Sequence, residues 1–305
     1  MSSTPQETSR RTRRRALSVA AVLGVAALGL GPVASAAPVV SNHHGDARAV
    51  PAPPAAPTRA DQIQNIDQVR TAIKAYYGDV TTSVQAPGGS AGTTLHQFDQ
   101  HGAYASEARG VSRNLSSYLD RVAQTSSHHG KSGKNDKTSK HGKHTKKAIV
   151  LDVDDTSLVT YSYEIFSNFA YSPANNAEFV NAGRKDVFPA TPGIAQTVKR
   201  AKAQGYSVFF LTGRPEVQRA GTEANLKQAG YPVASDQVYL KDLDAAWLSS
   251  CAPDCSTIEY KSLTRKHIEA AGYDIVANVG DQYSDLKGGY ADRTFKLPNP
   301  MYYLP

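Results

Sequence analysis

The sequence predicts an α/β protein in which a doubly wound, Rossmann-like parallel sheet carries a small helical cap and is preceded by N-terminal helices. Two observations support this class. Short β-rich runs alternate with helical segments from Ala148 onward, which is the pattern of βαβ units. Three helical segments also end in a Gly-Tyr pair, at Gly205, Gly230 and Gly272, where glycine supplies the left-handed C-cap of a helix that returns to a strand.

The first 36 residues are typical of an export signal. Five Arg among residues 10–15 precede an apolar run from Ala16 to Leu30, and the small residues at 34–36 predict cleavage near Ala36. The arginines also resemble a twin-arginine signal, which would export the folded protein, although many ordinary secretory signals are rich in arginine. The apolar run is shorter than the roughly 20 residues that cross a membrane, so a retained anchor is the weaker alternative. We therefore predict a secreted protein with no membrane partner after cleavage.

Two further segments lack the apolar periodicity of packed elements. Residues 37–60 are rich in Pro and Ala and predict an extended linker. Residues 126–147 are rich in Lys, His, Gly and Ser and predict a flexible insertion, with metal or anionic-surface binding by its four His as the alternative. Most of the positive charge lies in the signal and this insertion, and subtracting it from the net +7 leaves −3 for the rest. We therefore expect no nucleic-acid partner.

Residues 61–305 form the predicted folded domain. Apolar residues recur at helical spacing in 61–77 and 103–124. The expected strands are, in chain order, AIVLDV, SVFFLT, QVYL, DIVANVG and RTFKL. Cys251 and Cys255 are the only cysteines, and in an exported protein they predict a disulfide that stiffens a local turn. Two thiols are too few for a metal site.

The stretch AIVLDVDDTSL places Asp152 and Asp154 directly after a predicted buried strand. Ligands of parallel α/β sheets bind beyond the carboxyl ends of the strands, and residues two apart on a strand point the same way. The two carboxylates would therefore repel each other unless a cation, a shared proton or strong donors were present. A hard divalent metal, Mg²⁺ above all, meets that need, and a solvated Asp-rich turn is the alternative.

Candidate phosphate ligands follow the next predicted strand. SVFFLTGRPE ends in Thr212, Gly213 and Arg214, with Pro215 as the predicted first residue of a helix. A hydroxyl together with the amides of a helix start suits a phosphate. This signal is weak alone, because Thr-Gly is also common in ordinary turns.

The last candidates come from the final third of the chain. Lys261 lies near the start of a predicted helix, which is an unfavourable place for a cation unless it neutralises an anion, although an exposed lysine is the default interpretation. NVGDQYSDL ends an apolar run with Asp281, which could complete a metal site, and with Asp285, which could orient Lys261.

The ordered candidates resemble the four motifs of haloacid dehalogenase (HAD) superfamily phosphatases: Asp152-x-Asp154-x-Thr156, Thr212, Lys261, and Gly280-Asp281-x-x-x-Asp285. Each motif is common alone, whereas the ordered set is specific. The segments CAPDCSTIEYKS and FKLPNPMYYLP are also similar to subfamily IIIB, the acid phosphatase branch that contains plant vegetative storage proteins. The resemblance runs from about residue 61 to the end of the chain. The insertion at 126–147 departs from this family pattern, and its place before the first motif bears on regulation rather than chemistry.

The resemblance implies a HAD-type fold and a role for each matched residue. Asp152 would attack phosphorus to form an aspartyl-phosphate, while Asp154 would protonate the leaving oxygen and later activate water. Mg²⁺ would bind Asp152, the backbone carbonyl of Asp154, and Asp281. The resemblance also implies that Thr212, Gly213 and Lys261 bind phosphoryl oxygens and that Asp285 orients Lys261 or a metal-bound water. Outside the matched set, Arg214 could contact phosphate or, equally, form a structural ion pair. Asp155 occupies a variable position of the family pattern, and we interpret it as a turn or capping residue.

The segment 157–190 lies between the first two motifs, where related phosphatases have a small helical cap, and it is unusually aromatic. Its rings could stack on a nucleobase or an aryl ester, or they could simply fill the cap. We therefore predict an exported, Mg²⁺-dependent acid phosphatase that acts on small phosphomonoesters. The alternatives are a non-catalytic storage or binding protein of the same fold and a phosphotransferase. The sequence predicts no particular oligomeric state.

Overall fold

The computed structural model describes residues 52–129 and 145–304. The predicted signal, most of the linker and most of the Lys/His-rich insertion lie outside these residues. The helices are α1 Ile66–Tyr77, α2 Ala103–His129, α3 Tyr161–Phe166, α4 Pro173–Asn181, α5 Ile194–Ala203, α6 Arg219–Gln228, α7 Thr257–Ala270 and α8 Tyr283–Leu286, with short 3-10 helices η1 Glu216–Gln218, η2 Ser235–Gln237 and η3 Ala246–Leu248. The strands are β1 Val80–Gln85, β2 Thr94–Gln97, β3 Lys146–Leu151, β4 Ser207–Pro215, β5 Val238–Lys241, β6 Tyr273–Gly280 and β7 Thr294–Lys296.

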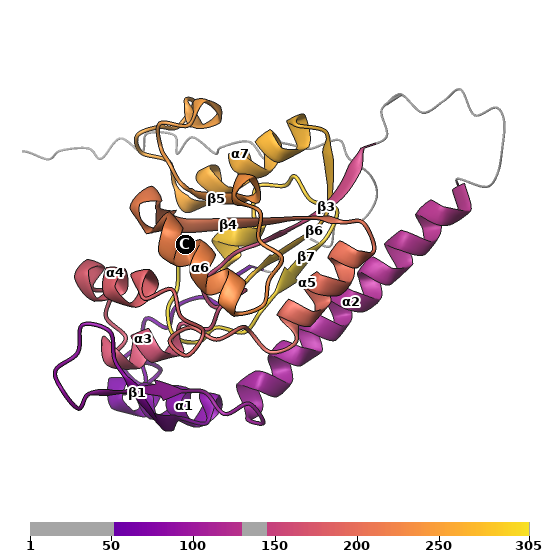
Figure 1. The fold of residues 1–305 in the computed structure, drawn as a ribbon. Helices are drawn as coiled ribbons and strands as arrows, with labels where there is room; N and C mark the ends of the chain where they lie inside the picture. Colours follow the sequence, from indigo (N-terminus) through magenta and orange to yellow (C-terminus); the bar gives the residue numbers. More distant parts are fainter. Residues whose placement is uncertain (1–51, 130–144, 305) are drawn as a thin grey trace, which may run out of the picture. The chain divides into compact units, whose positions relative to one another are not determined.

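A parallel sheet with the strand order β5-β4-β3-β6-β7 forms the centre of the described domain (Figure 1). Each of these strands coincides with one of the predicted β-rich runs, so the predicted α/β class is confirmed. Gly205, Gly230 and Gly272 have φ values of 91°, 93° and 95°, which only glycine adopts without strain, and each precedes the residue that begins the return to the sheet.

Helices cover both faces of this sheet (Figure 1). Successive residues of β3 alternate between two apolar clusters: Ile149 and Leu151 belong to the cluster that includes α2 and α5 residues, and Ala148 and Val150 belong to the cluster that includes α7 residues. All four are at most 1% exposed, so this part of the strand has no face toward solvent. This explains why its sequence is a continuous apolar run rather than an alternating one.

Two short helices, α3 and α4, lie in the predicted cap segment. An antiparallel β1-β2 hairpin, which the sequence analysis did not predict, contacts α3. The ring of Tyr77 from α1 stacks against Tyr104 of α2 and Tyr161 of α3, with centroid distances of 4.3 and 4.5 Å. Burial of such stacked rings ties the N-terminal helices to the cap.

Several boundaries differ from the prediction. Helix α1 begins at Ile66 rather than near residue 61, because the side chain of Asn65 accepts a hydrogen bond from the amide of Asp67 and caps the helix there. The predicted insertion 126–147 is shortened at both ends, since α2 continues to His129 and β3 begins at Lys146.

The prediction that Pro215 begins a helix was wrong. Pro215 is the last residue of β4, where it pairs with Lys241 of β5 after an irregularity in the ladder, and the 3-10 helix η1 starts only at Glu216. The predicted disulfide between Cys251 and Cys255 is present and closes a short loop between η3 and α7. In the described ranges, none of the helices combines the length and apolar character that a membrane crossing needs.

Candidate active site

The carboxyl ends of three neighbouring strands bring the predicted site residues to one edge of the sheet. Leu151, the last residue of β3, pairs with Phe210 of β4 on one side and Val279 of β6 on the other. Asp152 therefore emerges beside Thr212 and Asp281, although these residues are far apart in the sequence. Parallel pairing alone accounts for this convergence.

Lys261, from α7, lies between two carboxylates at this edge. Its ammonium donates hydrogen bonds to Oδ1 of Asp152 and, at 2.5 Å, to Oδ1 of Asp285. All three residues are at most 6% exposed. Burial alone would lower the pKa of Lys261, but the two carboxylates outweigh burial and raise it. Burial raises the pKa of Asp152, and the charge of Lys261 opposes that rise.

Asp281 is held by three side-chain donors. Its Oδ1 accepts from the Thr156 hydroxyl at 2.9 Å, and its Oδ2 accepts from Gln282 at 2.6 Å and from Asn299 at 2.8 Å. Burial, followed by repulsion from Asp285, raises the pKa of Asp281 to about 6, and these hydrogen bonds counteract part of the rise. The donors therefore fix the orientation of the carboxylate and favour its charged form.

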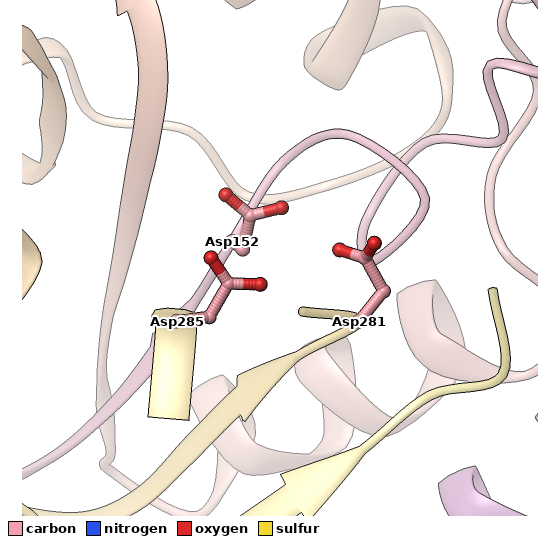
Figure 2. Close-up of side chains that lie close together, drawn as sticks. All are labelled: Asp152, Asp281 and Asp285. Carbon is pink, nitrogen blue, oxygen red and sulfur yellow. The ribbon is translucent and has the colours of Figure 1, made fainter. Parts of the chain in front are cut away.

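Asp152, Asp281 and Asp285 together form a cluster that fits a divalent cation (Figure 2). Each offers a carboxylate oxygen, and these oxygens lie within 4.8 Å of one another. Three ionised carboxylates and the ammonium of Lys261 leave a net charge of −2, which an ion such as Mg²⁺ would neutralise. The predicted metal ligands Asp152 and Asp281 belong to this cluster, and Asp285 joins it in addition to contacting Lys261. The backbone carbonyl of Asp154 as a metal ligand stays a prediction.

Asp154 is paired with Arg214. The Arg214 guanidinium donates to Asp154 through Nη2 at 2.6 Å and through Nε at 3.0 Å, and its Nη1 donates to the Thr222 hydroxyl at 3.0 Å. Arg214 is 4% exposed, whereas the Asp154 side chain is 29% exposed. Of the two sequence-based interpretations of Arg214, the structure contains the ion pair. The two-point contact with the Arg214 guanidinium fixes the position of the Asp154 carboxylate, which is the predicted acid/base group.

The two residues before Arg214 differ in their surroundings. Thr212 is fully buried; its hydroxyl lies 3.5 Å from Oδ2 of Asp154 and accepts from the Arg214 amide at 3.2 Å. Gly213 is exposed and lines the pocket described below. Their predicted contacts with phosphate stay predictions.

Asp155 and the C-terminal segment have contacts at the site that the sequence analysis did not predict. Asp155 has a φ of 52°, and its carboxylate accepts from the amide and hydroxyl of Thr160, which agrees with its predicted turn role. It also accepts from the hydroxyl of Tyr302 at 2.9 Å. Tyr302 and Leu304 line the pocket, so the FKLPNPMYYLP end, noted only for its family likeness, is part of the site.

A pocket of about 380 Å³ joins the carboxylate cluster to the cap. On the cap side it is lined by the aromatic side chains of Tyr163, Phe169 and Tyr171 and by the carboxylate-bearing Glu164. Sequence analysis did not single out Glu164. The available signal was a lone acidic residue in YSYEIF, a stretch that is otherwise mostly aromatic and aliphatic, which core packing alone does not explain.

At the carboxyl edge of its parallel sheet the structure therefore brings together an acidic cluster, a buried lysine and a helical cap. A family model described as HAD superfamily, subfamily IIIB (acid phosphatase), matches residues 96–305. The chain belongs to this family.

Named relatives include enzymes and storage proteins. The soybean (Glycine max) stem 28 kDa glycoprotein is 36% identical over 52% of this chain and 61% of its own length, so the match spans about three fifths of that relative. Acid phosphatase 1 of Solanum lycopersicum is 30% identical over 61% of this chain and 68% of its own. A Class C acid phosphatase from Bacillus anthracis, solved with tungstate bound, is 19% identical, with 78% and 86% of the two chains covered and a TM-score of 0.49.

Proposed function

We propose that this protein is an exported, Mg²⁺-dependent acid phosphatase that hydrolyses small phosphomonoesters through an aspartyl-phosphate intermediate. The observation that carries the proposal is the position of Asp152, which lines the pocket, is buried, and has its carboxylate against the ammonium of Lys261. A carboxylate in that position can attack a phosphorus atom whose charge is neutralised from the same side. The signal-like first 36 residues support export.

The reaction divides into two steps. In the first, an oxygen of Asp152 forms a bond to phosphorus as the bond to the ester oxygen breaks, and Asp154 donates its proton to the departing alcohol. In the second, Asp154 accepts a proton from the water that attacks phosphorus, which releases phosphate and restores Asp152. The pairing with Arg214 keeps the Asp154 carboxylate at one position during both transfers.

The remaining residues bind and orient. Lys261 would hold a transferring phosphoryl oxygen, with its ammonium positioned by Asp285. Mg²⁺ bound by Asp152, Asp281 and the Asp154 carbonyl would neutralise the developing charge on the phosphoryl group. Thr156, Gln282 and Asn299 donate hydrogen bonds to Asp281 and keep its carboxylate in place.

Release of p-nitrophenol from p-nitrophenyl phosphate tests this function. We expect turnover that stops on addition of chelator, returns with Mg²⁺, and falls at least about a thousandfold in Asp152→Asn. Asp236→Asn, which changes an exposed aspartate outside the pocket, is the matched control and should retain full activity. Activity that survives Asp152→Asn would falsify the assigned nucleophile.

Two alternatives have distinct outcomes in the same assay. Two of the relatives are vegetative storage proteins of Arabidopsis thaliana, which favours a non-catalytic storage role as the second candidate. That role predicts no turnover of any phosphomonoester by the unmodified protein. A phosphotransferase predicts that added glycerol lowers released phosphate relative to released p-nitrophenol.

A further inference from the structure

Glu164 is an acidic side chain of the pocket that the proposed reaction does not use. It lies on α3 in the cap, and it is 9% exposed. Each of the other acidic residues that line the pocket, Asp152, Asp154, Asp281 and Asp285, accepts at least one side-chain hydrogen bond. Within residues 52–129 and 145–304, the Glu164 carboxylate has no hydrogen bond or ion pair.

An unpaired carboxylate is an unfavourable neighbour for a phosphate ester. Burial, together with repulsion from Asp154, raises the pKa of Glu164 to about 7. When ionised, it repels both Asp154 and the anionic group that the pocket is proposed to bind. A ligand that carries its own positive charge removes this conflict, because its cation pairs with Glu164 while its phosphate pairs with Lys261.

The walls around Glu164 suit a cation better than a neutral polar group. Tyr163, Phe169 and Tyr171 line the same pocket, and the faces of aromatic rings attract ammonium groups. The amide of Phe169 donates to the carbonyl of Glu164 at 2.7 Å, which fixes the two residues next to each other. A second acceptor in the lining, the buried Oε1 of Gln218, also has no hydrogen-bond partner in the described part of the chain.

The backbone that presents Phe169 is strained. Asn168 and Phe169 have φ values of 56° and 57°, and a bulky residue such as phenylalanine rarely adopts this left-handed conformation. Strain of this kind persists where the surrounding structure over-determines a position, and it is concentrated at ligand-binding sites. Holding the ring of Phe169 at the pocket therefore has an energetic cost that simple filling of the cap does not require.

We propose that the physiological substrates are phosphomonoesters of amino alcohols, whose ammonium group, primary or quaternary, binds between the Glu164 carboxylate and the aromatic wall. This proposal rests on the proposed phosphatase function and names its substrate class. A hydroxyl-rich ester could donate hydrogen bonds to Glu164, but it would leave the negative charge of the carboxylate uncompensated.

The test compares phosphocholine with 3,3-dimethylbutyl phosphate, which has the same shape and a carbon in place of the charged nitrogen. We expect the kcat/KM of the unmodified protein to favour phosphocholine by at least about tenfold, the size of one charge-assisted contact. Glu164→Gln should reduce this ratio to within about threefold of unity, because the amide has no charge. Glu178→Gln, an exposed glutamate of the same cap on α4, is the matched control and should leave the ratio unchanged.

A second variant covers the case in which Glu164→Gln fails to fold. Tyr171 is 73% exposed, so Tyr171→Ala leaves the core intact, and it should lower kcat/KM for phosphocholine more than for the neutral ester. A ratio near unity in the unmodified protein would overturn the proposal, as would an equal loss on both esters in both variants. If Glu164→Gln instead selectively lowered kcat/KM for glycerol 1-phosphate, the proposal would be overturned in favour of hydroxyl recognition.

Failure of the proposed function has a different signature. In that case the unmodified protein hydrolyses neither ester nor p-nitrophenyl phosphate. Calorimetric titration with phosphocholine and with 3,3-dimethylbutyl phosphate then decides the present proposal: tighter binding of phosphocholine, lost in Glu164→Gln, supports cation recognition, and equal binding of the two esters refutes it.

Discussion

Replacing Lys261 by methionine removes the positive charge from the buried cluster while it keeps a side chain of similar length. The ammonium of Lys261 contacts both Asp152 and Asp285, and it is 4% exposed. Removing one partner of a buried ion pair costs roughly 3–5 kcal/mol, because the other partner is left charged and unpaired. Since two carboxylates share this ammonium, we expect Lys261→Met to lower the free energy of unfolding by about 4–5 kcal/mol at neutral pH.

The loss should depend on pH in a defined direction. Burial already raises the pKa of Asp152, and Lys261 is the group that opposes this rise, so the variant raises it further. A carboxyl group with a raised folded-state pKa contributes stability that is present below its unfolded pKa, near 4, and is lost as pH rises through the folded value. The deficit of Lys261→Met should therefore be small near pH 4 and largest at and above neutral pH. Added Mg²⁺ should recover part of it, since the cation compensates the same carboxylates.

Urea unfolding followed by circular dichroism measures this effect. The two proteins are compared near pH 4 and near pH 8, with chelator and then with Mg²⁺. Lys266→Met, an exposed lysine on the same helix α7, is the control and should shift the free energy of unfolding by less than about 0.5 kcal/mol. A deficit below about 1 kcal/mol at pH 8, or one of equal size at both pH values, would refute the assignment of Lys261 as the compensating charge.

Two more predictions concern the groups beside the cluster. Arg214→Lys should lower kcat by about 10–100-fold with a KM change below about threefold, because one ammonium cannot replace the two-point contact with Asp154 and the contact with Thr222; steady-state kinetics that show an unchanged kcat would contradict this positioning role. Burial and Asp154 raise the pKa of Glu164 from 4.5 to about 7, so its contribution to the free energy of unfolding is complete below pH 4.5 and lost as pH rises through about 7. In Glu164→Gln the free energy of unfolding should therefore no longer fall by up to about 3 kcal/mol between pH 4.5 and pH 7. Urea unfolding at several pH values measures this, and the same pH dependence in both proteins would contradict the raised pKa of Glu164.

Convergence of the cluster was predictable from the sequence because it follows from strand pairing. Once AIVLDV and DIVANVG are neighbouring parallel strands, Asp152 and Asp281 must emerge at the same edge. Asp285 lies within the short helix α8, which begins just after β6, so its approach to the cluster is also set by local structure. The unfavourable position of Lys261 in a helix start was a further local signal, and it pointed to an anionic partner.

The contacts that sequence analysis missed join segments without a local pattern. Asn299 donates to Asp281 from the irregular C-terminal segment, and Tyr302 reaches Asp155 from the same segment. Loops of this kind have no periodicity from which their path could be predicted. The sequence analysis allowed an ion pair for Arg214 but named no partner, and it expected a helix to begin at Pro215, whereas β4 continues through that residue.

The energetics of Lys261 connect the fold to the site. As the fifth residue of α7, it lies at the edge of the helix-start region, where a cation costs roughly 0.3–1 kcal/mol. Its contacts with Asp152 and Asp285 offset a penalty several times larger, since either carboxylate left alone in the interior costs several kcal/mol. Placing the lysine early in α7 is therefore the smaller cost. With its carboxylates ionised the cluster retains more negative than positive charge, so a bound cation would stabilise it further, and that residual charge supports the proposal of a metal site at these residues.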